Sequence, residues 1–211
     1  NLPPGLSDED FALMWEVIHR ECEKMGAAIV TGHTGRYDNC NYPMIGGATF
    51  MAMGPRTAYC SPKFCKPGDQ IIITKGPAVE ATGIFAAMFP GRIEQHGGPV
   101  LRRQAEDVFY RMSIVDDARI AASVGTRDRG VSAMHDATEY GIWGGLHEFA
   151  RAAKLGLVVH RDQIVMTPAV REVCELFQIE PFSSISEGTM IAAVRPHAAK
   201  EVLQRLTDHG I

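Results

Sequence analysis

The chain has 211 residues, enough for one large domain or for one complete domain and part of another. Hydrophobic residues make up 45% and charged residues 22%, the profile of an ordinary soluble globular protein. The net charge of −4 argues against a non-specific nucleic-acid binder, and no apolar run approaches the roughly 20 residues that a membrane span needs. Five scattered cysteines without a visible secretory signal indicate thiols in a reducing cytoplasm.

The first 55 residues predict one helix and two short strands. The chain opens on Asn1-Leu2-Pro3-Pro4-Gly5, which is typical of a linker inside a longer protein, so we expect a further segment upstream. Ser7 is a predicted N-cap for an amphipathic helix over 8–25. Apolar runs predict strands over 27–31 and 45–53. These elements are too few to form a core of their own easily.

Four prolines and glycines over 55–68 indicate a connection between domains, and the pattern changes after it. Strands and helices then alternate, which favours an α/β fold with helices covering a sheet. A glycine-proline stretch over 90–99, with His96-Gly97-Gly98, is predicted to be a loop, and 100–123 to be two helices with a break near Met112. The other predicted strands are 70–74, 131–134, 156–160 and 190–194, and the other predicted helices are 78–89, 142–154, 168–177 and 196–207.

The segment His135-Asp136-Ala137-Thr138-Glu139 places two acids and a hydroxyl where a strand is predicted to lead into a helix. A carboxylate in that position suits Mg²⁺ bridged to phosphate oxygens, and the helix N-terminus can face an anion. The alternative is a capping arrangement, in which Asp136 or Thr138 caps the helix and Glu139 interacts with its dipole.

Three further segments are candidates for a site. Lys75 follows a buried strand and opens a stretch of small residues that could hold an anion, although it could equally lie at the sheet edge with no ligand. The glycines around Gly32-His33-Thr34 permit close approach of a ligand, or simply form a tight turn. Glu187, in a polar glycine-containing turn, is either a substrate-facing acid or a loop residue. The Gly-x-Ser-x-Gly and His-Glu-x-x-His motifs and the nucleotide P-loop are absent.

Four segments in order resemble motifs of the superfamily of aminoimidazole ribonucleotide (AIR) synthetase, the PurM-like proteins. They are Gly32-His33-Thr34, Pro67-Gly68-Asp69-Gln70-Ile71-Ile72-Ile73, Met134-His135-Asp136-Ala137-Thr138-Glu139-Tyr140-Gly141 and Ile185-Ser186-Glu187-Gly188-Thr189-Met190. Within that superfamily the chain most resembles the HypE hydrogenase-maturation and archaeal AIR synthase-related branch. Tyr140 stands where the family has the first glycine of a Gly-Gly pair.

The resemblance implies a fold and a division of the chain. Residues 1–55 correspond to the last part of a PurM-like N-terminal α/β domain, 56–68 to a linker, and 69–211 to a PurM-like C-terminal domain with a mixed sheet covered by helices. The family's first domain begins well upstream of the segment that Asn1 opens, so we expect this chain to be incomplete by itself. A cysteine tail of the HypE type does not occur at the end of the sequence.

The resemblance also implies an activity: an ATP- and Mg²⁺-dependent enzyme, typically a homodimer, that activates a substrate oxygen by phosphorylation. Carried over by position, Asp136 is a metal ligand, Gly32, His33 and Thr34 line the nucleotide pocket, and Lys75, Thr138 and Glu187 act on a small-molecule or carbamoylated substrate. The alternatives are a non-catalytic ligand-binding or assembly relative, and a small-molecule kinase like thiamine-monophosphate kinase.

Overall fold

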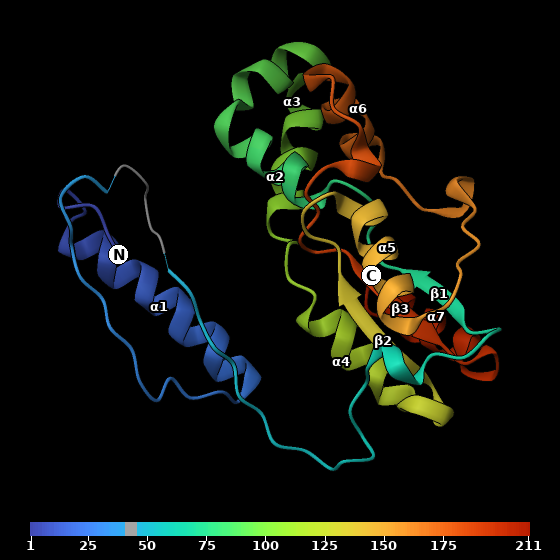
Figure 1. Cartoon of the computed structure of the whole chain (residues 1–211). Coiled ribbons are helices and arrows are strands. Elements are labelled where there is room, and N and C mark those ends of the chain that lie inside the picture. Colours follow the sequence, from blue (N-terminus) through green and yellow to red (C-terminus); the bar gives the residue numbers. More distant parts are fainter. Residues whose placement is uncertain (41–45) are drawn as a thin grey trace. The chain divides into compact units, whose positions relative to one another are not determined.

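The computed structural model describes residues 1–40 and 46–211, which form two compact units, Asn1–Met53 and Gly54–Ile211. Each unit is described by itself below. No described helix combines the length and the apolar character that a membrane crossing requires. The helices and strands are α1 (Asp8–Met25), β1 (Gln70–Ile73), α2 (Val79–Met88), α3 (Pro90–Phe109), α4 (Val115–Val124), β2 (Val131–Asp136), α5 (Gly141–Ala153), α6 (Pro168–Phe177), β3 (Met190–Val194) and α7 (Pro196–Asp208) (Figure 1).

The first unit contains the predicted helix but not the predicted strands. The Ser7 side chain accepts a hydrogen bond from the Asp10 amide, so α1 begins at the expected cap. Residues 27–31 form no strand, and Val30 is 78% exposed. Residues 46–53 form none either, while Ile45 lies outside the described residues. Both strand predictions are wrong for the described residues because an apolar run becomes a strand only when a neighbouring strand pairs with it.

The second unit is built on a three-stranded sheet in the order β1-β3-β2. The central strand β3 pairs antiparallel with both neighbours, Ile73 lying opposite Ile191 and Asp136 opposite Met190. All five residues of β3 are buried, which explains its uninterrupted apolar sequence. The α/β class is confirmed. The sheet was expected to be mixed, but both of its described strand pairings are antiparallel.

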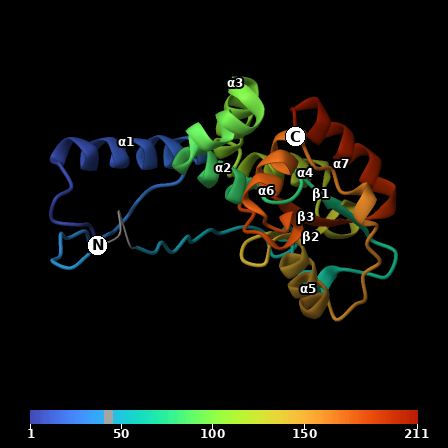
Figure 2. The ribbon, with the colours of Figure 1, turned by 90° about the horizontal axis from the view of Figure 1, so that it is seen from above.

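Helices cover both faces of this sheet, with α4 and α7 on one side and α5 on the other (Figure 2). The side chains of β1 and β3 divide accordingly, because successive residues of a strand point to opposite faces. Ile72 and Met190 pack with α4 and α7, whereas Ile71 and Ile191 pack with α5. The predicted strand 156–160 is wrong: only Leu157 of this run packs against the α5 side, and Val158 is 84% exposed.

Beyond the sheet, α2, α3 and α6 pack into a separate helical cluster (Figure 1). The stretch 90–99, predicted to be a loop, is part of α3, which has non-helical backbone angles at Gly98. Pro90 begins this helix, where its missing N–H costs nothing. Ile93 is fully buried against α6, and His96 lies 3.2 Å from Glu172, so burial and a cross-helix contact prevail over the local signal of glycine and proline.

Candidate functional site

Three loops meet at the edge of the sheet where β1 and β2 end and β3 begins, which we call the site edge. The amide of Thr74, just after β1, donates to the carbonyl of Met190 at 3.0 Å. The amide of Ala137, just after β2, donates to the carbonyl of Thr189 at 2.9 Å. Because β1 and β2 run in the same direction on either side of β3, their carboxyl ends lie together. The fold therefore brings the segments that carry Lys75, Asp136 with Thr138, and Glu187 to one edge.

The turn over 186–189 is tied to the start of α2 by a chain of hydroxyl groups. Ser186 Oγ accepts from the Val79 amide at 3.1 Å and lies 2.8 Å from Thr189 Oγ1, which donates to the Gly76 carbonyl at 2.6 Å. Since the Thr189 hydroxyl donates to Gly76, the Ser186 hydroxyl is the donor in the bond between them. Both hydroxyls are fully buried, so this turn is a fixed part of the site edge.

Glu187 and Gly188 complete this turn. Gly188 has a φ of 103°, and a Cβ atom there would lie 2.6 Å from the Arg111 carbonyl oxygen, so only glycine fits without displacing backbone. Glu187 is half-buried, and its Oε2 atom is buried without a hydrogen-bond partner among the described residues. A carboxylate oxygen in that state is costly unless a ligand, water or proton satisfies it, which is compatible with a role for Glu187 at this edge.

Asp136 ends β2 with its side chain half exposed. Its Oδ1 lies 3.2 Å from His135 Nδ1, and the other ring nitrogen of His135 lies 3.0 Å from Glu148 of α5. The capping alternative is wrong for both Asp136 and Thr138, because the N-cap of α5 is Tyr140 and no side chain caps the helix. The Asp136 carboxylate therefore keeps half of its surface available for a ligand.

Thr138 and Glu139, in the connection between β2 and α5, interact with each other. The backbone N–H of Glu139 and the Thr138 hydroxyl hold the pKa of the Glu139 carboxyl below its ordinary value. Tyr140, at the position of the family's glycine, has a φ of 58° and is 77% exposed. Its side chain thus projects to the surface of this unit, and the turn stays compact through backbone geometry.

Lys75 follows β1, and its ammonium group is buried in an ion pair. The Nζ atom donates to Asp117 Oδ2 of α4 at 3.0 Å and to the Ser113 carbonyl at 2.8 Å, and the two charged side chains are 5% and 2% exposed. Burial lowers the pKa of Lys75, and the hydrogen bond that Lys75 donates to the Asp117 carboxylate opposes that effect. The charge of Lys75 is therefore largely compensated by Asp117, which limits the electrostatic attraction that Lys75 can exert on an anion.

Gly32, His33 and Thr34 lie in the first unit, in an exposed stretch with no helix or strand. A Cβ atom at Gly32 would meet nothing within 4 Å, so the structure of this unit gives no steric reason for a glycine there. The site edge consists of residues of the second unit. The nucleotide-binding role of Gly32, His33 and Thr34 remains a prediction.

The residues at the site edge fit a Mg²⁺ ion that arrives with its ligand rather than a self-contained metal site. Among residues 1–40 and 46–211, no group of three or more His, Cys, Asp or Glu side chains could hold a metal ion. Mg²⁺ bound to phosphate commonly uses only one or two protein carboxylates and keeps several waters. The half-exposed carboxylate of Asp136 can serve as one such ligand.

Reasoning from the sequence missed the partners that hold these residues in place. Asp117 lies 42 residues after Lys75, and nothing in the local pattern links the two. Glu148 is also one of several acids on exposed helix faces and carries no distinguishing signal. Ser186 and Thr189 did lie in the turn singled out with Glu187, and their small polar character was the available signal.

Comparison with known proteins places this geometry in a family. Residues 66–211 match the model of the C-terminal domain of AIR synthase related proteins. A hydrogenase expression/formation protein of Methanocaldococcus jannaschii is 23% identical over 216 residues, which cover 100% of this chain and 58% of that protein. The carbamoyl dehydratase HypE of Escherichia coli is 33% identical over 123 residues, 57% of this chain and 37% of that protein.

Solved structures show the same fold. A crystal structure of E. coli HypE superposes with a TM-score of 0.75 at 22% identity, covering 99% of this chain and 61% of that one. HypE in complex with ATP gives a TM-score of 0.68 at 18% identity, covering 97% and 58%. The chain thus spans little more than half the length of these proteins. Because the family model covers more than two thirds of its residues, the chain belongs to the AIR synthase related proteins, matching them through their C-terminal domain.

Proposed function

We propose that this chain is part of an ATP- and Mg²⁺-dependent enzyme of the PurM/HypE type, which activates a substrate oxygen by phosphorylation. The observation that carries the proposal is the meeting of three loops at the site edge, with the half-exposed carboxylate of Asp136 among them. Relatives named carbamoyl dehydratase and a similar HypE structure holding ATP support the same reading. They favour a carbamoylated substrate over other small molecules.

In this proposal each predicted residue has a role. Asp136 is a ligand of the Mg²⁺ that accompanies ATP, and the ion neutralises charge on the phosphates. Thr138 and Glu187 contact the substrate, and Lys75 contributes positive potential from its buried ion pair. Gly32, His33 and Thr34 line the nucleotide pocket.

The proposal extends to the organisation of the protein. Residues 1–55 belong to a PurM-like N-terminal domain, 56–68 link it to the next, and 69–211 form the C-terminal domain. The active protein is a cytoplasmic homodimer.

A second candidate is an assembly role without catalysis. The compensated charge of Lys75 favours it, as does the likeness to a chain of a solved HypE–HypF complex, with a TM-score of 0.70 at 16% identity. In that case the protein binds a partner and turns over no ATP. Measuring ATP turnover by the full-length protein separates the two candidates, since any turnover that depends on Asp136 excludes a purely structural role.

The test of the leading proposal is the affinity of the full-length protein for Mg-ATP with and without the Asp136 carboxylate. Asp136→Asn keeps the side-chain volume and removes the charge, and we expect it to weaken Mg-ATP binding about tenfold or more, because a charge-assisted metal contact is lost. Asp162→Asn, at an exposed acid of the same unit, is the matched control and should leave binding unchanged. Equal affinity of wild type and Asp136→Asn contradicts the proposed metal role.

A further inference from the structure

A cavity of about 710 Å³ opens in the second unit beside the site edge, on the side of the sheet that α4 and α7 cover. Its walls come from the connection between α3 and α4, from α4, from α7 and from residues 209–211. Lys75 lines it, so the cavity borders the site edge, whereas Asp136, Thr138 and Glu187 are not among its lining residues. Its size falls within the range of about 300–1,000 Å³ that is usual for small-molecule sites.

The cavity is positively charged in an acidic protein. Its lining contains four Lys and Arg side chains and two Asp side chains, a net charge of +2 over the side chains with histidine neutral. The whole chain carries 21 Lys and Arg against 25 Asp and Glu. A local excess of cations against that background attracts anions. The charged lining residues are Lys75, Arg111, Arg119, Arg205, Asp116 and Asp117.

Two of the four cations are already paired with acids. Lys75 is paired with Asp117, and Arg205 lies 2.7 Å from Glu201, one turn away on α7. These pairs shape the cavity but leave little charge for a ligand. The cations that remain available to a ligand are therefore the two others.

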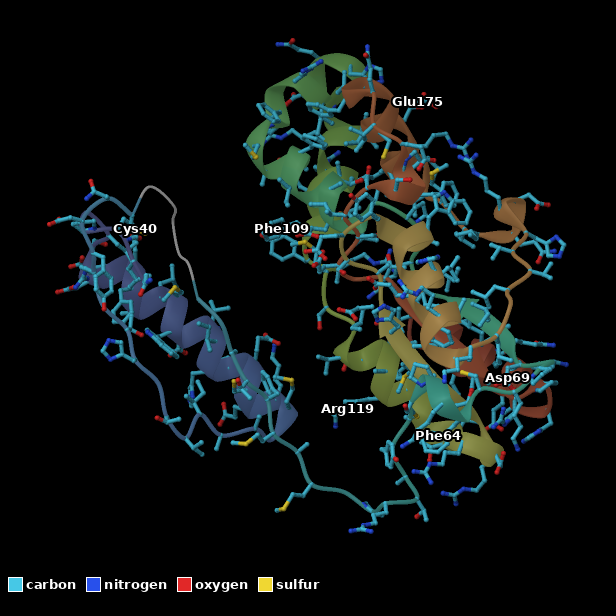
Figure 3. The ribbon with its side chains drawn as sticks, viewed as in Figure 1. Cys40, Phe64, Asp69, Phe109, Arg119 and Glu175 are labelled. Atoms are coloured by element: carbon cyan, nitrogen blue, oxygen red, sulfur yellow. The ribbon has the colours of Figure 1, made fainter. Side chains whose placement is uncertain are left out.

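The other two cations have no carboxylate partner among the described residues. Within residues 1–40 and 46–211, the only hydrogen bond of the Arg111 side chain goes to the Gly210 carbonyl, at a long 3.4 Å. Arg119 makes no hydrogen bond or ion pair within the described chain, and its side chain extends outward from α4 (Figure 3). Guanidinium groups offer paired N–H donors that match the oxygens of a phosphate.

We propose that this cavity binds the phosphate group of a small molecule, with Arg111 and Arg119 donating to its oxygens. Two unpaired guanidinium groups balance the charge of a phosphate monoester, and the cavity has room for a sugar-sized body attached to it. Asp116, the acid at the same rim, opposes binding and disfavours more highly charged anions. Of the residues given a role in the proposed function, Lys75 alone is among the described lining residues, and its charge is paired with Asp117. The inference therefore does not depend on ATP chemistry.

The test measures binding of ribose 5-phosphate and of inorganic phosphate to the full-length protein by calorimetry, without nucleotide and at low salt. We expect both to bind. The double variant Arg111→Gln with Arg119→Gln should weaken binding about tenfold or more, because two charge-assisted contacts are lost. Arg103→Gln, at an exposed arginine of α3 outside the cavity, should bind like the wild type.

A variant with the opposite expected sign keeps the test independent of any damage to folding. Asp116→Asn should bind ribose 5-phosphate several-fold more tightly, because it removes the repelling charge at the rim. Absence of phosphate binding at millimolar concentration, or wild-type affinity in the double variant, overturns the proposal. Citrate that binds as tightly as ribose 5-phosphate overturns the assignment to phosphate.

Discussion

The two ends of the three-stranded sheet each contain a buried ion pair, but the cations of the two pairs differ in how many protein groups they bond. At the end opposite the site edge, Arg195 donates to both oxygens of Asp69 at 2.6 and 2.7 Å and also to the Phe64 carbonyl and Asp128. Figure 3 labels Asp69 and Phe64 in that region. At the site edge, Lys75 has two partners. Each pair keeps one buried atom without a partner among the described residues, Asp117 Oδ1 at the site edge and Arg195 Nε at the other end.

This difference separates a structural cluster from a candidate site. The Arg195 cluster bonds both terminal guanidinium nitrogens to protein groups and joins the segment before β1 to the start of α7. The site edge instead combines two carboxylate oxygens that lack a partner among the described residues, Asp117 Oδ1 and Glu187 Oε2, with loops fixed by hydroxyls and glycine. Buried polar groups that lack partners concentrate where ligands bind, so the comparison supports placing the site at the edge with Lys75.

The largest effect is expected from breaking the cluster opposite the site. Arg195→Ala should lower the free energy of unfolding by about 3–5 kcal/mol, because it leaves Asp69 buried without its cation. Arg205→Ala, which breaks an exposed pair with Glu201, is the control and should cost about 1 kcal/mol or less. Urea denaturation monitored by circular dichroism measures both. Equal losses in the two variants contradict the structural role of the cluster.

A smaller effect is expected from crowding the site edge. Gly188→Ala should destabilise by about 2–4 kcal/mol, the sum of strain at positive φ and overpacking against the backbone of Arg111. Gly68→Ala is a matched control, since Gly68 has a φ of 93° with nothing within 4 Å of an added Cβ, and it should cost only the strain, about 1–2 kcal/mol. If the two variants lose the same stability, the tight packing at Gly188 is not present in solution.

The smallest effect concerns pH and the charge of Lys75. Its folded pKa is lowered, so between that value and the ordinary value of 10.5 the folded protein has lost a proton that the unfolded chain still binds. Between these two pKa values the contribution of Lys75 to the free energy of unfolding rises with pH. Below the folded pKa, the cost of the buried charge is fully present. We expect the stability of the wild type, relative to Lys75→Met, to increase with pH as it approaches 10.5.

The measurement for that prediction is the free energy of unfolding of both proteins at several pH values from 7 to 10. Taking the difference cancels the contribution of titrating groups that lie far from Lys75. Lys200→Met, at an exposed lysine of α7, should show no such trend against the wild type. A flat difference for Lys75→Met means that the ammonium is not buried as described.

Local sequence signals correctly predicted α1 and β3. Ser7 and Gly26 delimit α1 at the expected residues, and the buried run at 190–194 became β3. The same reasoning failed at 27–31 and 156–160, where apolar runs have no neighbouring strand to pair with in the described structure. It also failed at 90–99, where packing against α6 outweighs the helix-breaking tendency of glycine and proline.

The sequence by itself determined the family, most of the elements from β1 onward and the segments that carry Asp136, Lys75 and Glu187, because caps, apolar runs and motif spacing depend on residues close along the chain. Only the tertiary structure decided that these segments share one edge, that Asp117 takes the charge of Lys75, and that Asp69 meets Arg195 126 residues away. Long-range pairings of this kind depend on how strands are ordered and which helices cover them, and no local pattern of residues encodes that choice.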